Sequence, residues 1–262
     1  MGNEATKREV AIGNRVLGHV GLCTGVTASL GHVSVRVPED PGRFVVKGRG
    51  YEVDAIPAMR ADEMIVCDLD GNKLEGPPGA TQCYEVKIHS CIYRRYPEVT
   101  SVVHAHPRNV VLMSLLGPRL VPMCNEGSQL VRRPLPMWPH SRLVSTDSDG
   151  EEVAALLQDG QAALLQGHGA VTTGRSISQS ISNMMNLEEQ ARMNYLALCA
   201  SGPDHPRIPE QLLEEAASAP SFWELPHFRS SLPDEGGDLQ ARRASSQLGP
   251  YLYWASLVEE GV

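Results

Sequence analysis

Aromatic residues are scarce in this chain, at 5% of its 262 positions, so a folded core must consist largely of Val, Leu, Ile, Met and Ala. Basic residues are also in the minority, with 23 Lys and Arg against 31 Asp and Glu, and they form no run. A nucleic-acid backbone is bound by clustered cations, so the net charge of −8 argues against general nucleic-acid binding. The contents of 42% hydrophobic and 21% charged residues exclude wholesale disorder.

Long apolar stretches and paired cysteines are missing as well. No apolar run approaches the roughly 20 residues that a membrane-spanning helix needs, so we expect no membrane partner. The six cysteines are scattered and include no C-x-x-C pair. This spacing is typical of reduced thiols that pack as small hydrophobic side chains. The sequence therefore predicts a soluble cytoplasmic protein.

The hydrophobic pattern predicts a mixture of helices and short strands. Helices are expected over residues 4–20, 81–95, about 147–157 and 176–200, and strands over 32–37, 44–47, 64–69, 101–106, 120–123 and 161–166. Because strands and helices do not alternate strictly, we expect an α/β fold, a three-layer αβα sandwich around a mainly antiparallel central sheet. Residues 1–202 are expected to form one domain. Residues 203–262, which begin with a stretch rich in Pro, Ser and charge, are expected to form a C-terminal arm with a closing helix over 239–258.

Histidines at the ends of two strands form the most informative pattern in the sequence. His104 and His106 lie two residues apart at the end of a predicted strand, so both imidazoles point to the same face. His168 follows another short apolar strand, between two glycines that leave room for a ligand near the backbone. Three histidines with an open coordination position are typical of a catalytic metal site. The alternative is three unrelated polar residues at strand ends, because H-x-H pairs often arise by chance.

Four ordered blocks resemble the class II aldolase/adducin family over about residues 5–200. The blocks are Gly31-His32-Val33-Ser34-Val35-Arg36, Asp68-Leu69-Asp70-Gly71, the region from Tyr84-Glu85 to His104-Ala105-His106-Pro107, and Gln166-Gly167-His168-Gly169. The resemblance implies that His104, His106 and His168 hold a divalent ion, most often zinc, with Mn, Co or Fe as alternatives. It also implies that Glu85 is the catalytic acid/base, since a partly desolvated carboxylate beside a metal can have its pKa tuned. His89, one turn later, is expected to be a packed helix residue.

Three polar patches that bind phosphate in the sugar-phosphate members of this family are altered here. His32 stands where those members have an Asn in the early strand. Gly48-Arg49-Gly50, with no Thr or Ser, stands where they have a turn rich in Thr or Ser. Gln82-Cys83-Tyr84 stands where they have a Ser pair. A phosphate pocket needs several converging neutral donors, so a phosphorylated sugar is disfavoured. Arg49 and His32 suit a carboxylate instead. The alternatives are a surface turn residue for Arg49 and a strand residue bonded to the backbone for His32.

The segment 31–85 and the tail after residue 203 resemble the decarboxylase branch of the family. That branch acts on hydroxylated aromatic or ring-cleaved dicarboxylic acids, such as dihydroxyphthalate, in catabolic pathways. The resemblance implies a metal-dependent carbon–carbon lyase with a small anionic substrate and decarboxylation as the leading reaction. Two alternatives stay open: an aldolase acting on a non-phosphorylated hydroxy or keto acid, and a non-catalytic adducin-like binding domain. The latter would be expected to have lost its metal ligands.

Family members usually form tetramers whose active sites lie at subunit interfaces, so the resemblance also implies a homo-oligomer. Tyr251 or Tyr253 in the tail would then reach a neighbouring site, with packing inside the chain as the alternative. The remaining histidines match no motif of the family: His19, His140, His205 and His227.

Overall fold

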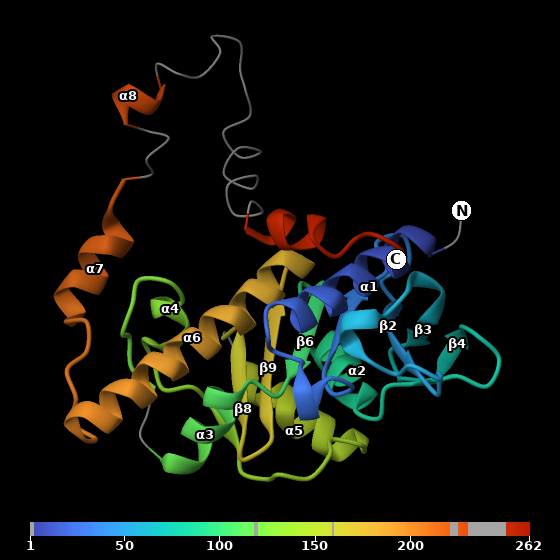
Figure 1. Cartoon of the computed structure of the whole chain (residues 1–262), viewed down its shortest axis with the longest axis horizontal. Helices are drawn as coiled ribbons and strands as arrows, with labels where there is room; N and C mark the ends of the chain where they lie inside the picture. Colours follow the sequence, from blue (N-terminus) through green and yellow to red (C-terminus); the bar gives the residue numbers. More distant parts are fainter. Residues whose placement is uncertain (1–2, 118–119, 159, 221–224, 230–249) are drawn as a thin grey trace.

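One sheet organises the computed structural model, which describes residues 3–117, 120–158, 160–220, 225–229 and 250–262 (Figure 1). Within these residues nine strands pair in the order β4-β3-β2-β1-β6-β9-β8-β7, with β5 beside β2. The strands are β1 (His32–Arg36), β2 (Arg43–Arg49), β3 (Met64–Asp68), β4 (Lys73–Glu75), β5 (Thr81–Gln82), β6 (Ser101–Ala105), β7 (Met137–Trp138), β8 (Ala162–Leu165) and β9 (Gly169–Gly174). All pairings are antiparallel except that of β7 with β8. The expected antiparallel sheet is confirmed.

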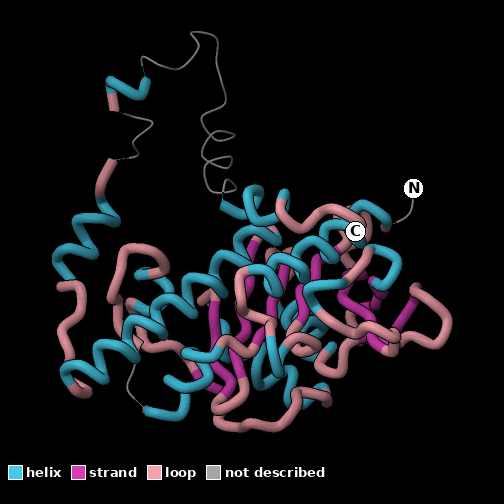
Figure 2. Tube along the Cα trace, viewed as in Figure 1, coloured by secondary structure: helices cyan, strands magenta, loops and turns pink. Residues whose placement is uncertain are grey.

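Helices cover both faces of this sheet (Figures 1 and 2). On one face lie α1 (Glu4–His19), α3 (Arg108–Leu116) and α6 (Ile177–Ser201), and on the other lie α2 (Val86–Arg95) and α5 (Asp147–Leu157). Successive strand residues point to opposite faces, which creates two separate cores. Val103 of β6 packs on the side of α1 and α6, whereas its neighbour Val102 packs on the side of α2 and α5. The three-layer αβα arrangement is therefore confirmed.

Two segments differ from the expected secondary structure. The helix expected over 81–95 begins only at Val86, because residues 81 and 82 pair with β2 as the short strand β5. The strand expected over 120–123 is wrong. The amides of Val121 and Met123 bond instead to the side chains of Asn194 and Gln190 in α6, at 3.1 and 2.9 Å. Polar side chains of a helix thus replace a neighbouring strand as partners for this backbone.

The last residues of the chain return to α1. After α4 (Ser128–Val131), α7 (Glu210–Ser218) and α8 (Pro226–Arg229), residues 250–256 are helical, and the rest of the closing helix expected over 239–258 lies outside the described residues. Arg15 of α1 donates to the carbonyl oxygens of Val258, Glu260 and Gly261 at 3.1, 2.6 and 3.0 Å. Tyr251 packs into the core of its own chain, whereas Tyr253 is 57% exposed.

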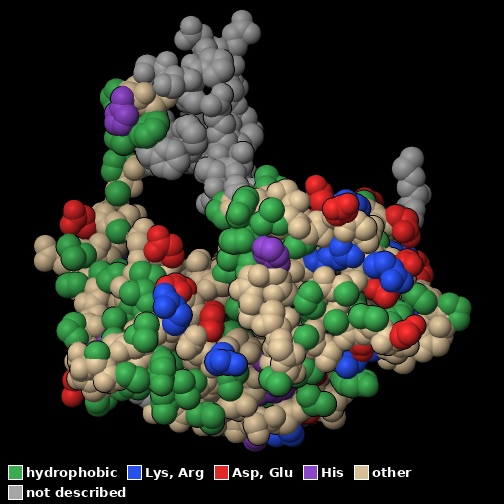
Figure 3. Space-filling view, viewed as in Figure 1, with side chains coloured by type: hydrophobic (Ala, Val, Ile, Leu, Met, Phe, Trp, Pro, Cys, Tyr) green, Lys and Arg blue, Asp and Glu red, His purple; other side chains and the backbone are tan. Residues whose placement is uncertain are grey.

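Charged side chains of both signs share one face of the molecule (Figure 3). On the face seen in Figure 3, Lys and Arg side chains lie interspersed with Asp and Glu. None of the helices in the described part of the chain combines the length and the apolar character that crossing a bilayer requires.

Candidate metal and catalytic site

Neighbouring strands bring the predicted histidines together. His104 lies near the end of β6 and His106 directly follows that strand, while His168 lies in the turn that enters β9. Strands β6 and β9 are antiparallel partners, so the end of one lies beside the start of the other. This close approach requires glycine at Gly169, since a Cβ there would collide with the carbonyl oxygen of Ala105. Residues more than sixty positions apart therefore meet at one end of these two central strands.

Glu85 reaches the same point from the start of α2, where it occupies the N-cap position. Its Oε1 accepts a hydrogen bond from the amide of Val144 at 3.0 Å, which holds the carboxylate in place. Its Oε2 lies 3.2 Å from Nε2 of His104 and 3.6 Å from Nε2 of His168. The structure thus brings all four residues into one group, here called the His/Glu cluster (Glu85, His104, His106 and His168), in which His106 is half-buried and the other three are buried.

The donor set of the His/Glu cluster fits a divalent metal ion. One ligand atom from each of its four residues lies within 4.8 Å of the others. Nδ1 of His104 donates to the carbonyl oxygen of Ala170 at 3.0 Å, so the lone pair of its Nε2 faces the cluster, 2.9 Å from Nε2 of His106. Among the described residues, neither ring nitrogen of His168 has a hydrogen-bond partner, although both are buried. A buried polar atom without a partner is costly, and a metal ion bound at one of these two nitrogens would supply a partner for it.

The electrostatics of the His/Glu cluster favour the protonation states that bind metals. Burial raises the pKa of the Glu85 carboxyl, but the neighbouring imidazoles of His104 and His168 offset this effect and hold that pKa well below its usual range. Burial, together with the same two histidines, lowers the pKa of His106 to about 3. Carboxylates and neutral imidazoles are the forms that coordinate a cation. The site therefore needs no deprotonation of these two groups near neutral pH.

His32 lies beside the His/Glu cluster. It sits directly opposite His104 in the pairing of β1 with β6, and the two ring centres are 5.2 Å apart. His89 is fully buried in α2, as expected for a packed helix residue, but its Nε2 lies 2.6 Å from Nδ1 of His32. This contact was not among the features predicted from sequence. The spacing of Glu85 and His89 was a usable signal, because positions four apart near a helix start share one face.

Arg49, at the end of β2, packs against the residue that precedes Glu85. Its guanidinium lies 4.3 Å from the ring centre of Tyr84, and its Nε is 3.3 Å from Oδ2 of Asp54. The other carboxylate oxygen of Asp54 is 2.9 Å from Nζ of the buried Lys47. Two cations therefore share one carboxylate, which leaves an excess of positive charge around Arg49.

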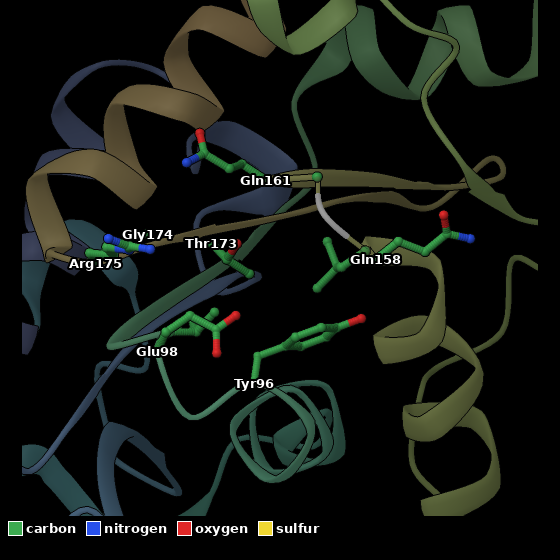
Figure 4. A pocket seen from close by; sticks show the side chains of 10 residues that line it. Tyr96, Glu98, Gln158, Gln161, Thr173, Gly174 and Arg175 are labelled. Carbon is green, nitrogen blue, oxygen red and sulfur yellow. The ribbon is translucent and has the colours of Figure 1, made fainter.

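A separate pocket of about 270 Å³ opens at the other end of β6 and β9 (Figure 4). Val99, which precedes β6, and Gly174, which ends β9, belong to its lining, together with polar side chains that include Glu98 and Arg175. The described lining contains none of the residues predicted for the site. The His/Glu cluster lies at the opposite ends of the same two strands.

The chain is similar to known proteins over most of its length. The class II aldolase and adducin N-terminal domain matches residues 8–195. A 3,4-dihydroxyphthalate decarboxylase from Arthrobacter keyseri is 29% identical over 205 residues, which cover 75% of this chain and 80% of that protein. An L-fuculose phosphate aldolase from Methanococcus maripaludis is 26% identical over 173 residues, 65% of this chain and 87% of the relative. The crystal structure of an aldolase II superfamily protein from Pseudomonas syringae covers 98% of this chain and 96% of its own, with a TM-score of 0.74 and 18% identity, and supports the fold.

Proposed function

This chain belongs to the class II aldolase and adducin family, and the relatives named above include a decarboxylase and an aldolase. We therefore propose that it is a metal-dependent carbon–carbon lyase. The proposed reaction is decarboxylation of a hydroxylated aromatic dicarboxylic acid of the dihydroxyphthalate type. The observation that carries this proposal is the His/Glu cluster, with its orphaned His168. An intact ligand set of this kind argues against the non-catalytic binding domain. The decarboxylase relatives and the excess positive charge around Arg49 support an anionic substrate.

His104, His106 and His168 would hold the divalent ion, for which we propose zinc. When bound, the ion supplies Lewis-acid stabilisation of the negative charge that CO2 leaves behind on the substrate. Glu85 transfers the proton in the proposed reaction. It is a carboxylate before substrate arrives, and it takes up the proton of a substrate hydroxyl, whose oxygen is later reprotonated from water. It then delivers that proton to the ring carbon, which has kept the electron pair of the broken carbon–carbon bond.

Product analysis on the purified, metal-loaded chain tests the proposed reaction. Incubation with 3,4-dihydroxyphthalate should release one CO2 for each substrate consumed and leave a dihydroxybenzoate. A parallel incubation with a non-phosphorylated hydroxy acid should release no aldehyde. The aldolase relative makes the reverse pattern the second candidate, because the same charge stabilisation serves retro-aldol cleavage. Aldehyde without CO2 would replace decarboxylation by aldol cleavage as the function.

Arg49 and His32 are proposed to bind the substrate carboxylate that is not lost. Replacing Arg49 with Gln should raise KM for a dicarboxylate about tenfold or more, since a hydrogen bond between charged groups contributes roughly 1.5–3 kcal/mol. The kcat should change much less, because this carboxylate does not react. Initial rates over a range of substrate concentrations check the result. Arg43→Gln, at the partly exposed start of the same strand, is the matched control, and an equal rise in both variants would refute the role of Arg49.

We further propose a homo-oligomer, a tetramer, whose active sites lie at subunit interfaces. Large exposed apolar side chains support this, because they lie next to members of the site: Tyr84 precedes Glu85, and Leu143 precedes Val144. Exposed apolar groups beside a site are typical of a surface covered by another chain. The division into a catalytic domain over 1–202 and an extension over 203–262, and a cytoplasmic location, belong to the same proposal.

A further inference from the structure

We propose that His89 is a positioning residue for His32. It holds the imidazole of His32 in the tautomer whose Nε2–H donates a hydrogen bond to the substrate. The identity of the acceptor, a substrate carboxylate, rests on the proposed function. The hydrogen-bond arrangement itself does not, because it belongs to the protein without substrate.

A buried chain of polar groups joins α2 to β1 behind the His/Glu cluster. The hydroxyl of Tyr93 lies 2.7 Å from Oγ of Ser34, and this Oγ lies 2.6 Å from Nδ1 of His89. Nε2 of His89 then lies 2.6 Å from Nδ1 of His32. All four residues are buried. Positions two apart on the strand and four apart on the helix each share one face, which explains how two elements build the chain.

The distances give this chain a direction. The Tyr93 hydroxyl has two acceptors, Oγ of Ser34 at 2.7 Å and the carbonyl oxygen of Thr100 at 3.5 Å, and the latter already accepts from the amide of Arg36 at 2.8 Å. A contact of 3.5 Å lies beyond the usual range of such bonds, so Tyr93 donates to Ser34.

Each later member of the chain carries one hydrogen, because a hydroxyl and a neutral imidazole have one each. Burial lowers the pKa of His89 to about 3, which keeps its ring neutral. Ser34 therefore donates to Nδ1 of His89, and Nε2–H of His89 donates to Nδ1 of His32. The remaining hydrogen of His32 must be on Nε2.

Nε2 of His32 lies at the free end of this chain of hydrogen bonds. Among the described residues no hydrogen bond to this nitrogen is found, and His32 is 4% exposed, with its ring beside that of His104. A preorganised neutral donor at this place suits a carboxylate or a developing oxyanion. Without His89, the His32 ring would be free to take the other tautomer and present an acceptor, which repels an anion. His89 thus acts on the substrate through His32.

The same residues allow a competing interpretation. His32, Cys83 and His89 offer ligand atoms within 4.8 Å of one another, as a second metal site would. The hydrogen bond at 2.6 Å between the two imidazoles already uses one nitrogen of each ring, Nδ1 of His32 and Nε2 of His89, and Nδ1 of His89 is bonded to Ser34. Burial also raises the pKa of the Cys83 thiol, which opposes the thiolate that binds metals.

Nitrogen NMR of the full-length, zinc-loaded chain with 15N-labelled histidine tests the arrangement without turnover. We expect Nε2–H tautomers for both His32 and His89. His89→Gln should preserve the His32 tautomer, because the amide of Gln donates from nearly the same place, whereas His89→Leu should release it. Cys83→Ala should change neither the tautomers nor the zinc content. An Nδ1–H tautomer of His32 in the parent chain, or a second zinc lost in Cys83→Ala, would overturn the proposal.

The effect on substrate binding is measured with 3,4-dihydroxyphthalate as the ligand. His89→Leu should raise its dissociation constant, or its KM where turnover is observed, about tenfold with a smaller change in kcat, and His89→Gln should recover most of the loss. Equal losses in both variants would indicate a merely structural role and refute the positioning role. Failure of the proposed reaction leaves the tautomer result intact, so the two failures are distinguishable.

Discussion

Replacing His106 with alanine is expected to remove bound metal and activity together. The replacement takes one imidazole out of the His/Glu cluster and leaves a gap where a ligand lies 2.9 Å from His104. Residues that only support metal ligands cost about 10–100-fold in affinity or activity when they are replaced, so loss of a ligand should exceed this range. Elemental analysis after dialysis should find about one zinc per parent chain and a small fraction of that in His106→Ala. CO2 release should fall in parallel.

Thermal unfolding gives an independent measure of the same loss. At a zinc concentration about 1,000 times its dissociation constant, binding to the folded state stabilises the parent chain by roughly 4 kcal/mol. A chelator should therefore lower the melting temperature of the parent chain and have little effect on His106→Ala. His19→Ala is the matched control, because His19 is exposed and packs beside Trp254. Full zinc content and unchanged CO2 release in His106→Ala would show that the His/Glu cluster is not the metal site.

The local parts of the site were predictable from sequence. The spacing of His104 and His106 places both on one face of any strand, whatever lies beside it. The glycines around His168 mark a tight approach, and Gly169 indeed lies against the backbone of Ala105. Glu85 needed the family resemblance, because nothing in its own neighbourhood distinguishes a catalytic carboxylate from a helix cap.

Features that depend on strand order were beyond the sequence. His32 and His104 face each other only because β1 pairs with β6 in one register, and that pairing joins segments about seventy residues apart. The contact of His32 with His89 also depends on how α2 lies across β1. The strand predicted over 120–123 was wrong for a related reason. Side chains of α6 accept hydrogen bonds from the backbone of this segment, and periodicity cannot reveal such a distant partner. Local periodicity shows which residues of an element share a face, but it does not show which other element lies beside that face.

Replacing Glu85 with glutamine should separate proton transfer from metal binding. The amide keeps the shape of the side chain and the acceptor that bonds Val144, but it can no longer take up and deliver a proton. Positioned acid/base groups contribute about 10²–10⁴-fold to rates, so kcat for CO2 release should fall within that range. Zinc content should stay near that of the parent chain, because the three histidines remain. Steady-state rates and elemental analysis on the same preparation check both expectations.

Glu98→Gln is the control for loss of a carboxylate, since Glu98 is exposed and lines the separate pocket at the far end of β6. Loss of zinc together with activity in Glu85→Gln would make Glu85 chiefly a ligand, and unchanged kcat would remove it from the reaction. With zinc content and KM both retained, the fall in kcat reports a contribution made only in the transition state. In the proposed reaction this carboxyl group takes up the proton and delivers it to the carbon, so that result would assign Glu85 as the proton carrier.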